Sequence, residues 1–213
     1  MEVGRLIILE GGEGAGKSTL VKNLEKELSG TGLRVVCTRE PGGTPWGEKI
    51  RSLLIEKDSN IDHHLSPAAQ LLGHYMARFE HLERVILPAL SSGKTVISDR
   101  FEISSYAYQV YALGDTLLEN IFADLHKYVV EQLRPYQCIY FFCDLDPAAG
   151  LARVDGRGEK KTIFDEAAIE FHEKVREGMK KAQAHIDSHF TCHTIDASDS
   201  EEGMLRQAVN LLR

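Results

Sequence analysis

The residues with the clearest chemical meaning lie near the start of the chain, between Gly11 and Ser18. They read GGEGAGKS and match the spacing Gly-x4-Gly-Lys-Ser, the Walker A pattern of phosphate-binding loops. Glycines let backbone N–H groups turn towards phosphate oxygens, Lys17 can reach the β- and γ-phosphates, and the Ser18 hydroxyl can bind Mg²⁺. We therefore expect ATP and Mg²⁺ to bind here rather than a glycine-rich turn with a chance lysine. The residues expected to hold ATP are Gly11, Gly12, Glu13, Gly14, Ala15, Gly16, Lys17, Ser18 and Thr19.

The carboxylate of Glu13 is out of place in a loop that binds anions. A triphosphate would repel it, so we expect the side chain to point out of the loop, towards whatever lies opposite the γ-phosphate. A sugar hydroxyl is a suitable partner, because an ionised carboxylate only accepts hydrogen bonds. The alternative is a side chain that is simply solvated.

Three other polar stretches indicate a second anionic ligand. TREPGGTPWGEKIR (38–51) and DRFEISSYAYQ (99–109) each follow an apolar run, and HYMARFEH (74–81) lies on an expected helix. Taken singly, an arginine is usually solvated and an Asp-Arg pair is usually a weak ion pair. Their joint occurrence at expected strand ends is what favours a binding site.

These motifs need elements that bring them to one edge of the fold. Five apolar runs alternate with helical stretches, and their continuous hydrophobicity indicates strands buried on both faces, as in a parallel sheet. We expect strands over 6–10, 34–40, 95–99, 138–146 and 192–197. We expect helices over 18–28, about 68–90, 116–134, 166–185 and 201–213. The alternation predicts an α/β fold with a doubly wound parallel sheet and ligands at the carboxyl ends of its strands.

Bulk composition narrows the class of protein. The 213 residues are 43 % hydrophobic, which suits one α/β domain, and the net charge of −7 gives no general attraction to nucleic acid or an anionic membrane. No apolar run approaches the roughly 18 residues of a membrane span. The four cysteines are scattered and look like reduced thiols, and Met1 leads into a strand rather than a signal peptide. We expect a soluble cytoplasmic protein.

The motifs taken together resemble the bacterial thymidylate kinases. EGGEGAGKST, REPGGTPxGE, a helical arginine, DRF-x3-SxAYQ and a final IDAS occur in the order of that family and span residues 6–198. The resemblance implies a single P-loop NTPase domain with a five-stranded parallel sheet, and a short lid at about 150–164. It also implies transfer of the ATP γ-phosphoryl group to dTMP, giving dTDP for dTTP biosynthesis, with Mg²⁺ and as a homodimer.

The resemblance assigns roles around the acceptor phosphate and sugar. Glu13 falls where the family keeps an acidic residue near the 3′-hydroxyl. Arg100 would hold the acceptor phosphate in a bidentate grip, while Asp99 orders Mg²⁺ through water. Arg39 and Arg51, which flank the PGG turn, are further candidates for that phosphate.

The resemblance also assigns a base-binding edge. Arg78 matches an arginine that binds a thymine carbonyl, with Ser105 and Gln109 on the same edge, and Tyr108 crowds the 2′ position of the sugar. The residues expected to bind dTMP are Glu13, Arg39, Pro41, Arg51, His74, Arg78, Asp99, Arg100, Ser105, Tyr108 and Gln109.

Two positions depart from the family pattern. His74 stands where a phenylalanine commonly stacks on thymine; it either stacks in its place, and then could charge near pH 6.5, or points elsewhere on its helix. The lid reads RGE followed by KKT, without the usual second arginine. The expected catalytic residues are Lys17, Arg100, Arg153 and Arg157, with Lys160 and Lys161 as substitutes for a lid arginine.

Three other functions compete with this interpretation. Another nucleoside or nucleotide kinase would share the phosphate loop and lid, and its choice of base would distinguish it. A nucleotide-dependent switch or partner-binding ATPase is disfavoured by the absence of an NKxD motif and by the second cluster of arginines. A non-catalytic dimerisation protein is disfavoured because Lys17, Ser18, Asp99 and Arg100 are intact.

Overall fold

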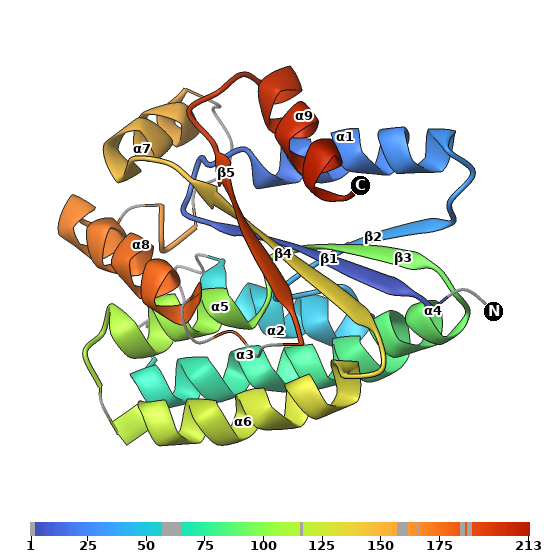
Figure 1. Cartoon of the computed structure of the whole chain (residues 1–213). Helices are drawn as coiled ribbons and strands as arrows, with labels where there is room; N and C mark the ends of the chain where they lie inside the picture. The colour runs from blue at the N-terminus through green and yellow to red at the C-terminus, as the bar shows by residue number, and fades with distance from the viewer. Residues whose placement is uncertain are drawn as a thin grey trace.

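Five parallel strands form one sheet at the centre of the protein (Figure 1). The computed structural model describes residues 3–56, 65–115, 117–156, 162–165, 167–183, 186 and 189–213. The spatial order of the strands is β2-β3-β1-β4-β5, which confirms the predicted α/β architecture. The strands are β1 (Arg5–Gly11), β2 (Val35–Arg39), β3 (Thr95–Asp99), β4 (Gln137–Asp144) and β5 (Thr191–Asp196).

Helices cover both faces of this sheet. Most are α-helices, and two segments, η1 and η2, have π-helical hydrogen bonding. The helical segments are α1 (Lys17–Gly30), α2 (Pro45–Ile55), α3 (Pro67–His81), η1 (Leu82–Ile86), α4 (Leu87–Ser91), α5 (Glu102–Ser105), η2 (Tyr106–Tyr111), α6 (Leu117–Leu133), α7 (Pro147–Asp155), α8 (Ile169–Gln183) and α9 (Glu201–Leu211).

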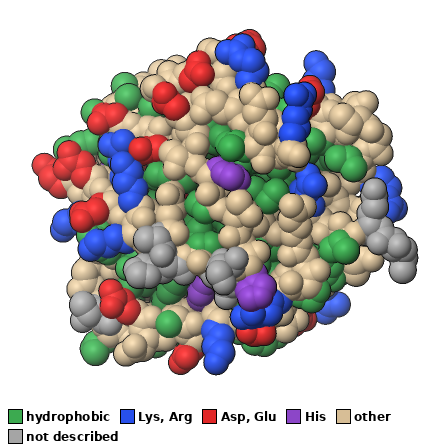
Figure 2. Space-filling view, viewed as in Figure 1, with side chains coloured by type: hydrophobic (Ala, Val, Ile, Leu, Met, Phe, Trp, Pro, Cys, Tyr) green, Lys and Arg blue, Asp and Glu red, His purple; other side chains and the backbone are tan. Residues whose placement is uncertain are grey.

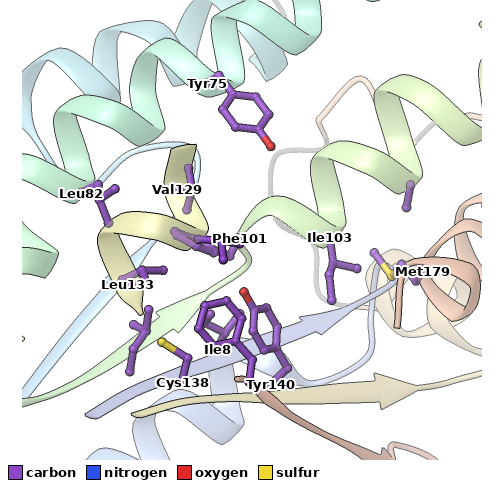
Figure 3. Packing of buried hydrophobic residues seen from close by; sticks show 14 of the residues in the cluster. Ile8, Tyr75, Leu82, Phe101, Ile103, Val129, Leu133, Cys138, Tyr140 and Met179 are labelled. Carbon is purple, nitrogen blue, oxygen red and sulfur yellow. The ribbon is translucent and has the colours of Figure 1, made fainter. Parts of the chain in front are cut away.

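Side chains that alternate along the strands fill two separate cores. Ile7 and Leu9 of β1 pack with Leu24 of α1 and Met204 of α9 on one face. On the other face, shown in Figure 3, Ile8 and Tyr140 meet residues from α3, η1, α5, α6 and α8. Burial on both faces is the reason that the central strands read as continuous apolar runs.

Four helical segments were missing from the sequence-based expectation: α2, α7, and the consecutive pair α5 and η2 that follows Arg100. Residues 38–51 were expected only as a polar stretch after a strand, yet α2 begins at Pro45, capped by the Thr44 hydroxyl, which accepts from Gly47 N. Likewise α7 begins at Pro147 behind the Asp146 cap, so the lid expected from residue 150 starts inside a helix. For α2 and α7, a cap residue followed by proline was the available signal.

Parallel register brings the carboxyl ends of the central strands to one edge. Leu9 of β1 lies beside Asp99 of β3, and Asp99 lies beside Arg39 of β2. On the face seen in Figure 2, basic and acidic side chains are interspersed, without a large patch of one sign. None of the helices in the described ranges combines the length and apolar character needed to cross a membrane.

Candidate active site

The phosphate loop joins the end of β1 to the N-terminus of α1, where free backbone N–H groups and the helix dipole favour an anion. Gly11, Gly14 and Gly16 have φ values of 152°, 69° and 77°, a region that favours glycine. The buried Lys17 donates from Nζ to the carbonyl of Gly12 at 2.7 Å. The loop therefore has the backbone shape and the cation that a triphosphate requires.

The phosphate loop packs against α7 without room for a side chain between the two backbones. A Cβ atom on Gly14 would overlap the carbonyl of Gly150, and a Cβ atom on Gly150 would overlap the carbonyl of Glu13. Further along α7, Arg153 donates to the carbonyl of Ala197 at 3.0 Å and to that of Gly14 at 3.4 Å. The helix is thus a fixed wall of the loop.

Ser18 and Asp99 meet at the mouth of the loop, as the strand order requires. The Ser18 hydroxyl donates to Asp99 Oδ2 at 2.6 Å. The described residues contain no group of three His, Cys, Asp or Glu side chains that could hold a metal ion alone. A pocket of about 1020 Å³, partly open to solvent, surrounds the loop. Its lining residues are Glu13, Gly14, Ala15, Gly16, Lys17, Ser18, Thr19, Arg39, Glu40, Arg51, Asp99, Arg100, Val154, Thr162 and Asp165.

Glu13 points out of the loop and pairs with Arg100. The Arg100 guanidinium donates to Glu13 Oε1 at 2.8 Å and to the Gly11 carbonyl at 2.9 Å, and the Tyr108 hydroxyl donates to the same Oε1 at 2.9 Å. Burial raises the pKa of Glu13, but Arg100 and Lys17 outweigh it and hold the pKa at about 2. The carboxylate is therefore ionised and is the counter-ion of Arg100.

The turn that carries Arg100 is held by a buried carboxyl that the sequence analysis did not single out. Arg100 has a φ of 72°, a conformation that costs a non-glycine residue about 1–3 kcal/mol. Glu10 Oε1 accepts from Phe101 N at 2.9 Å and Ser104 N at 3.3 Å, and its Oε2 accepts from the Ser104 hydroxyl at 2.5 Å. Burial raises the pKa of Glu10 to about 7, against the opposing effect of the Ser104 hydrogen bond.

A second pocket lies beside the first and encloses about 540 Å³, including its open part. Glu13, Glu40, Arg51, Arg100 and Thr162 line both pockets, so charged groups form the boundary between them. The complete lining is Glu13, Glu40, Pro41, Arg51, Ile55, His74, Arg78, Arg100, Phe101, Ser104, Ser105, Tyr108, Gln109, Thr162 and Phe164. Of these, Ile55 lies outside every predicted motif, and Thr162 and Phe164 lie at the end of the expected lid without a predicted role.

Arg78 reaches this pocket from the interior of α3. Its Nε donates to Glu40 Oε2 at 2.7 Å, and its Nη2 donates to Ser105 Oγ at 2.9 Å. The third nitrogen, Nη1, is buried and has no partner among the described residues. Gln109 is also buried and lines the same pocket. A buried guanidinium with one unpartnered nitrogen suits a ligand that brings an acceptor.

His74 lies one helical turn before Arg78 and lines the same pocket. Burial lowers the pKa of His74, and Arg78, Arg100 and Arg51 lower it further, to about 3. The expectation that His74 becomes charged near pH 6.5 is therefore wrong, because three guanidinium groups and desolvation oppose its protonation. The imidazole is neutral across the physiological range.

The remaining predicted residues take several positions. Arg39 is half-exposed and pairs with Glu48 at 2.8 Å, while Arg51 donates to the carbonyl of Pro41 at 3.0 Å. Arg39 and Arg51 both line the phosphate pocket. Arg157, Lys160 and Lys161 lie outside the described residues.

A third pocket of about 650 Å³, partly open to solvent, adjoins the phosphate loop between α1 and α9. Gly14, Gly16, Thr19 and Arg153 of its lining were singled out from the sequence, but a separate pocket at this place was not predicted. Its lining residues are Gly14, Gly16, Thr19, Leu20, Asn23, Arg153, Asp199, Ser200, Glu201 and Met204.

A five-stranded parallel sheet with a Gly-x4-Gly-Lys-Ser loop between its first strand and first helix defines a P-loop NTPase. The family model described as Thymidylate kinase matches residues 9–208. The chain is 36 % identical to a thymidylate kinase of Bacillus velezensis over 210 residues, which is 98 % of this chain and 95 % of the relative. It is 40 % identical to that of Magnetococcus marinus over 186 residues, covering 83 % and 80 %. The crystal structure of thymidylate kinase from Ehrlichia chaffeensis matches with a TM-score of 0.75 and 29 % identity, covering 99 % of this chain and 100 % of that chain. This chain belongs to the thymidylate kinase family, as its motifs predicted.

Proposed function

We propose that the protein transfers the γ-phosphoryl group of ATP to dTMP, giving ADP and dTDP in the synthesis of dTTP. The observation that carries this proposal is the shared boundary of the two pockets, where Glu13, Arg51 and Arg100 face both a triphosphate loop and a second cavity. Phosphoryl transfer needs a donor and an acceptor in line, with cations between them.

The phosphate loop supplies the donor side. Lys17 leaves the Gly12 carbonyl to bind the β- and γ-phosphates, and the loop N–H groups hold the remaining oxygens. Ser18 Oγ and Asp99 Oδ2 fit Mg²⁺, which prefers oxygen ligands, with Asp99 acting through water. Bound Mg²⁺ would neutralise charge on the β- and γ-phosphates. The third pocket accommodates the adenosine half of ATP.

In the second pocket, charged side chains bind the phosphate and the sugar of the acceptor dTMP. Arg100 holds the dTMP phosphate, with Arg39 and Arg51 alongside it. Both donors to Glu13 use Oε1, so Oε2 is free among the described residues to accept from the 3′-hydroxyl. Tyr108, fixed by that same Oε1, crowds the 2′ position and disfavours ribonucleotides.

The base of dTMP lies further into the second pocket. The unused Nη1 of Arg78 supplies a donor for a thymine carbonyl, and Ser105 and Gln109 complete the edge. Neutral His74 forms part of the wall, where an imidazole can stack on the base. Cytosine and guanine would leave buried donors unpaired and are disfavoured for that reason.

Catalysis follows from positioning and charge neutralisation, with no dedicated strong base. A cation from the lid neutralises the transferring group, a contribution worth about 10³–10⁵ in rate in related NTPases. Arg153 is bound to the Ala197 carbonyl at the rim of the third pocket, which favours a role in holding ATP. The catalytic lid cation is then Arg157, with Lys160 and Lys161 as alternatives.

We also propose a cytoplasmic homodimer. Large apolar side chains are exposed on adjacent helices, among them Trp46 of α2, Met76 of α3 and Tyr128 of α6, with Met76 59 % exposed. Such a patch is typical of a subunit interface. All four cysteines are free thiols, which is usual for the cytoplasm.

The proposal is tested by ADP release with ATP and Mg²⁺, using dTMP, dUMP, ribothymidine monophosphate, dCMP, dGMP and AMP as acceptors. One methyl group in an apolar pocket is worth about 1–3 kcal/mol, so we expect dUMP to be a weaker but real substrate after dTMP. ADP release that does not depend on any acceptor would leave a P-loop ATPase and refute the proposal.

A further inference from the structure

We propose that His81 is a positioning residue that sets the orientation of Arg78 through Glu40, and so controls recognition of the acceptor base. The inference rests on the proposed function, because it assumes that Arg78 reads a nucleotide base. It assigns a role to a series of hydrogen-bonded side chains that runs from Thr38 of β2 to Arg78 in the lining of the second pocket.

The series has three links, and every member except Thr38 is almost completely buried. The Thr38 hydroxyl lies 2.5 Å from His81 Nε2, and His81 Nδ1 lies 3.0 Å from Glu40 Oε1. Glu40 Oε2 then accepts from Arg78 Nε at 2.7 Å. The side chains of His81, Glu40 and Arg78 are 0 %, 3 % and 1 % exposed.

The donors and acceptors available to these side chains fix the direction of each hydrogen bond between them. An ionised Glu40 can only accept, so Nδ1 of His81 must carry a proton towards it. A neutral imidazole then presents Nε2 as an acceptor for the Thr38 hydroxyl, and each donor meets an acceptor. The backbone of Gly43 lies close to this pair, because a Cβ atom added there would be 2.5 Å from His81 Nε2 and 2.7 Å from Thr38 Oγ1.

Glu40 therefore has each oxygen committed to a different partner. Without His81, Oε1 would be left unpaired in the interior, and the carboxylate would be free to rotate towards Arg78. The guanidinium of Arg78 is confined between the rings of Tyr75 and Phe101, with Cζ 4.5 and 5.2 Å from their centres. A rotated Glu40 would redirect Nη1, the donor that is left for the ligand.

Two substitutions of His81 test its two ring nitrogens separately, Nδ1 towards Glu40 and Nε2 towards Thr38. In His81→Asn the amide nitrogen takes the place of Nδ1 and keeps the link to Glu40. In His81→Gln the amide oxygen takes the place of Nε2 and can still accept from the Thr38 hydroxyl, while the link to Glu40 is lost. The two variants are matched in chemistry, and both remove the imidazole, so general disturbance of packing acts on both.

For His81→Gln we expect the KM for dTMP to rise about tenfold and the preference for dTMP over dCMP to fall, with kcat and the KM for ATP within about threefold of wild type. His81→Asn should recover most of the wild-type KM for dTMP. Thr38→Val, which removes only the distal hydroxyl, should raise that KM less than His81→Gln does.

Equal effects of Asn and Gln, or losses of kcat and of ATP binding as large as the loss of dTMP binding, would overturn the inference and leave His81 as a packing residue. If both His81 variants fail to fold, Thr38→Val provides the test. An unchanged KM for dTMP and an unchanged base preference in Thr38→Val would then refute the proposed role of the Thr38–His81–Glu40–Arg78 hydrogen bonds. Wild-type enzyme that shows no preference among acceptors would instead refute the proposed function, so the two failures are distinguishable.

Discussion

Glu10 should make the protein less stable as the pH rises, and Glu10→Gln should remove that loss. Each tenfold change in proton affinity is worth about 1.4 kcal/mol, so the difference between the ordinary pKa of 4.5 and the raised value of about 7 amounts to about 3 kcal/mol. Below pH 4.5 both folded and unfolded chains keep the proton, and there is no cost. Between pH 4.5 and 7 the unfolded chain releases the proton while the folded chain retains it, so the free energy of unfolding falls.

Glutamine is a suitable replacement because its oxygen can still accept from Phe101 N and Ser104 N, and its amide can donate to the Ser104 hydroxyl. We expect urea unfolding of Glu10→Gln, compared with wild type, to show a relative gain of about 3 kcal/mol between pH 4.5 and 8. Glu27→Gln on the exposed side of α1 is the control for losing one negative charge. A wild-type-to-variant difference that stays constant over this pH range would refute the reasoning.

Three further perturbations test separate parts of the site. Titration of His74 should not change the KM for dTMP between pH 5.5 and pH 8, because its pKa of about 3 keeps the ring neutral. The measurement is the pH profile of this KM in wild type and in His74→Phe, which should run parallel. Gly150→Ala should push α7 off the phosphate loop and weaken ATP binding at least about tenfold, as measured by calorimetry. Met76→Glu should place a charge in the exposed apolar patch of α3 and turn dimer into monomer in analytical ultracentrifugation.

Each of these has a result that would count against it. A KM that rises at acidic pH in wild type but not in His74→Phe would mean that the imidazole does take up a proton. Wild-type affinity for ATP in Gly150→Ala would mean that the loop and α7 can separate without cost. A wild-type protein that sediments as a monomer would remove the proposed interface altogether.

Features with a local physical cause could be predicted from the sequence. The phosphate loop depends on glycines and a lysine within eight residues, and the strands depend on continuous apolar runs, so both were identified. The ion pair of Glu13 with Arg100 joins residues 87 positions apart and depends on the register of β1 and β3. The outward direction of Glu13 was predicted from the sequence with a sugar hydroxyl as its partner, but the ion pair with Arg100 was not.

The helices that were not predicted and the wrong expectation for the charge of His74 have different causes. The starts of α2 and α7 carry a cap residue followed by proline, so these helices could have been recognised. The pKa of His74 could not, because it depends on burial and on three arginines contributed by separate segments. In the same way, Glu10 and His81 act through contacts that no spacing in the sequence announces.

The close approach of Gly14 and Gly150 has a consequence for how the gene can change. A clash between two side chains can be relieved by shortening the partner, but here each partner is a backbone carbonyl, present whatever residue is encoded. No second-site substitution at the contact can therefore restore an alanine variant. A genetic suppressor screen that starts from Gly150→Ala should therefore return reversion to glycine. Glycine at position 14 and glycine at position 150 are required together for the loop and the helix to pack.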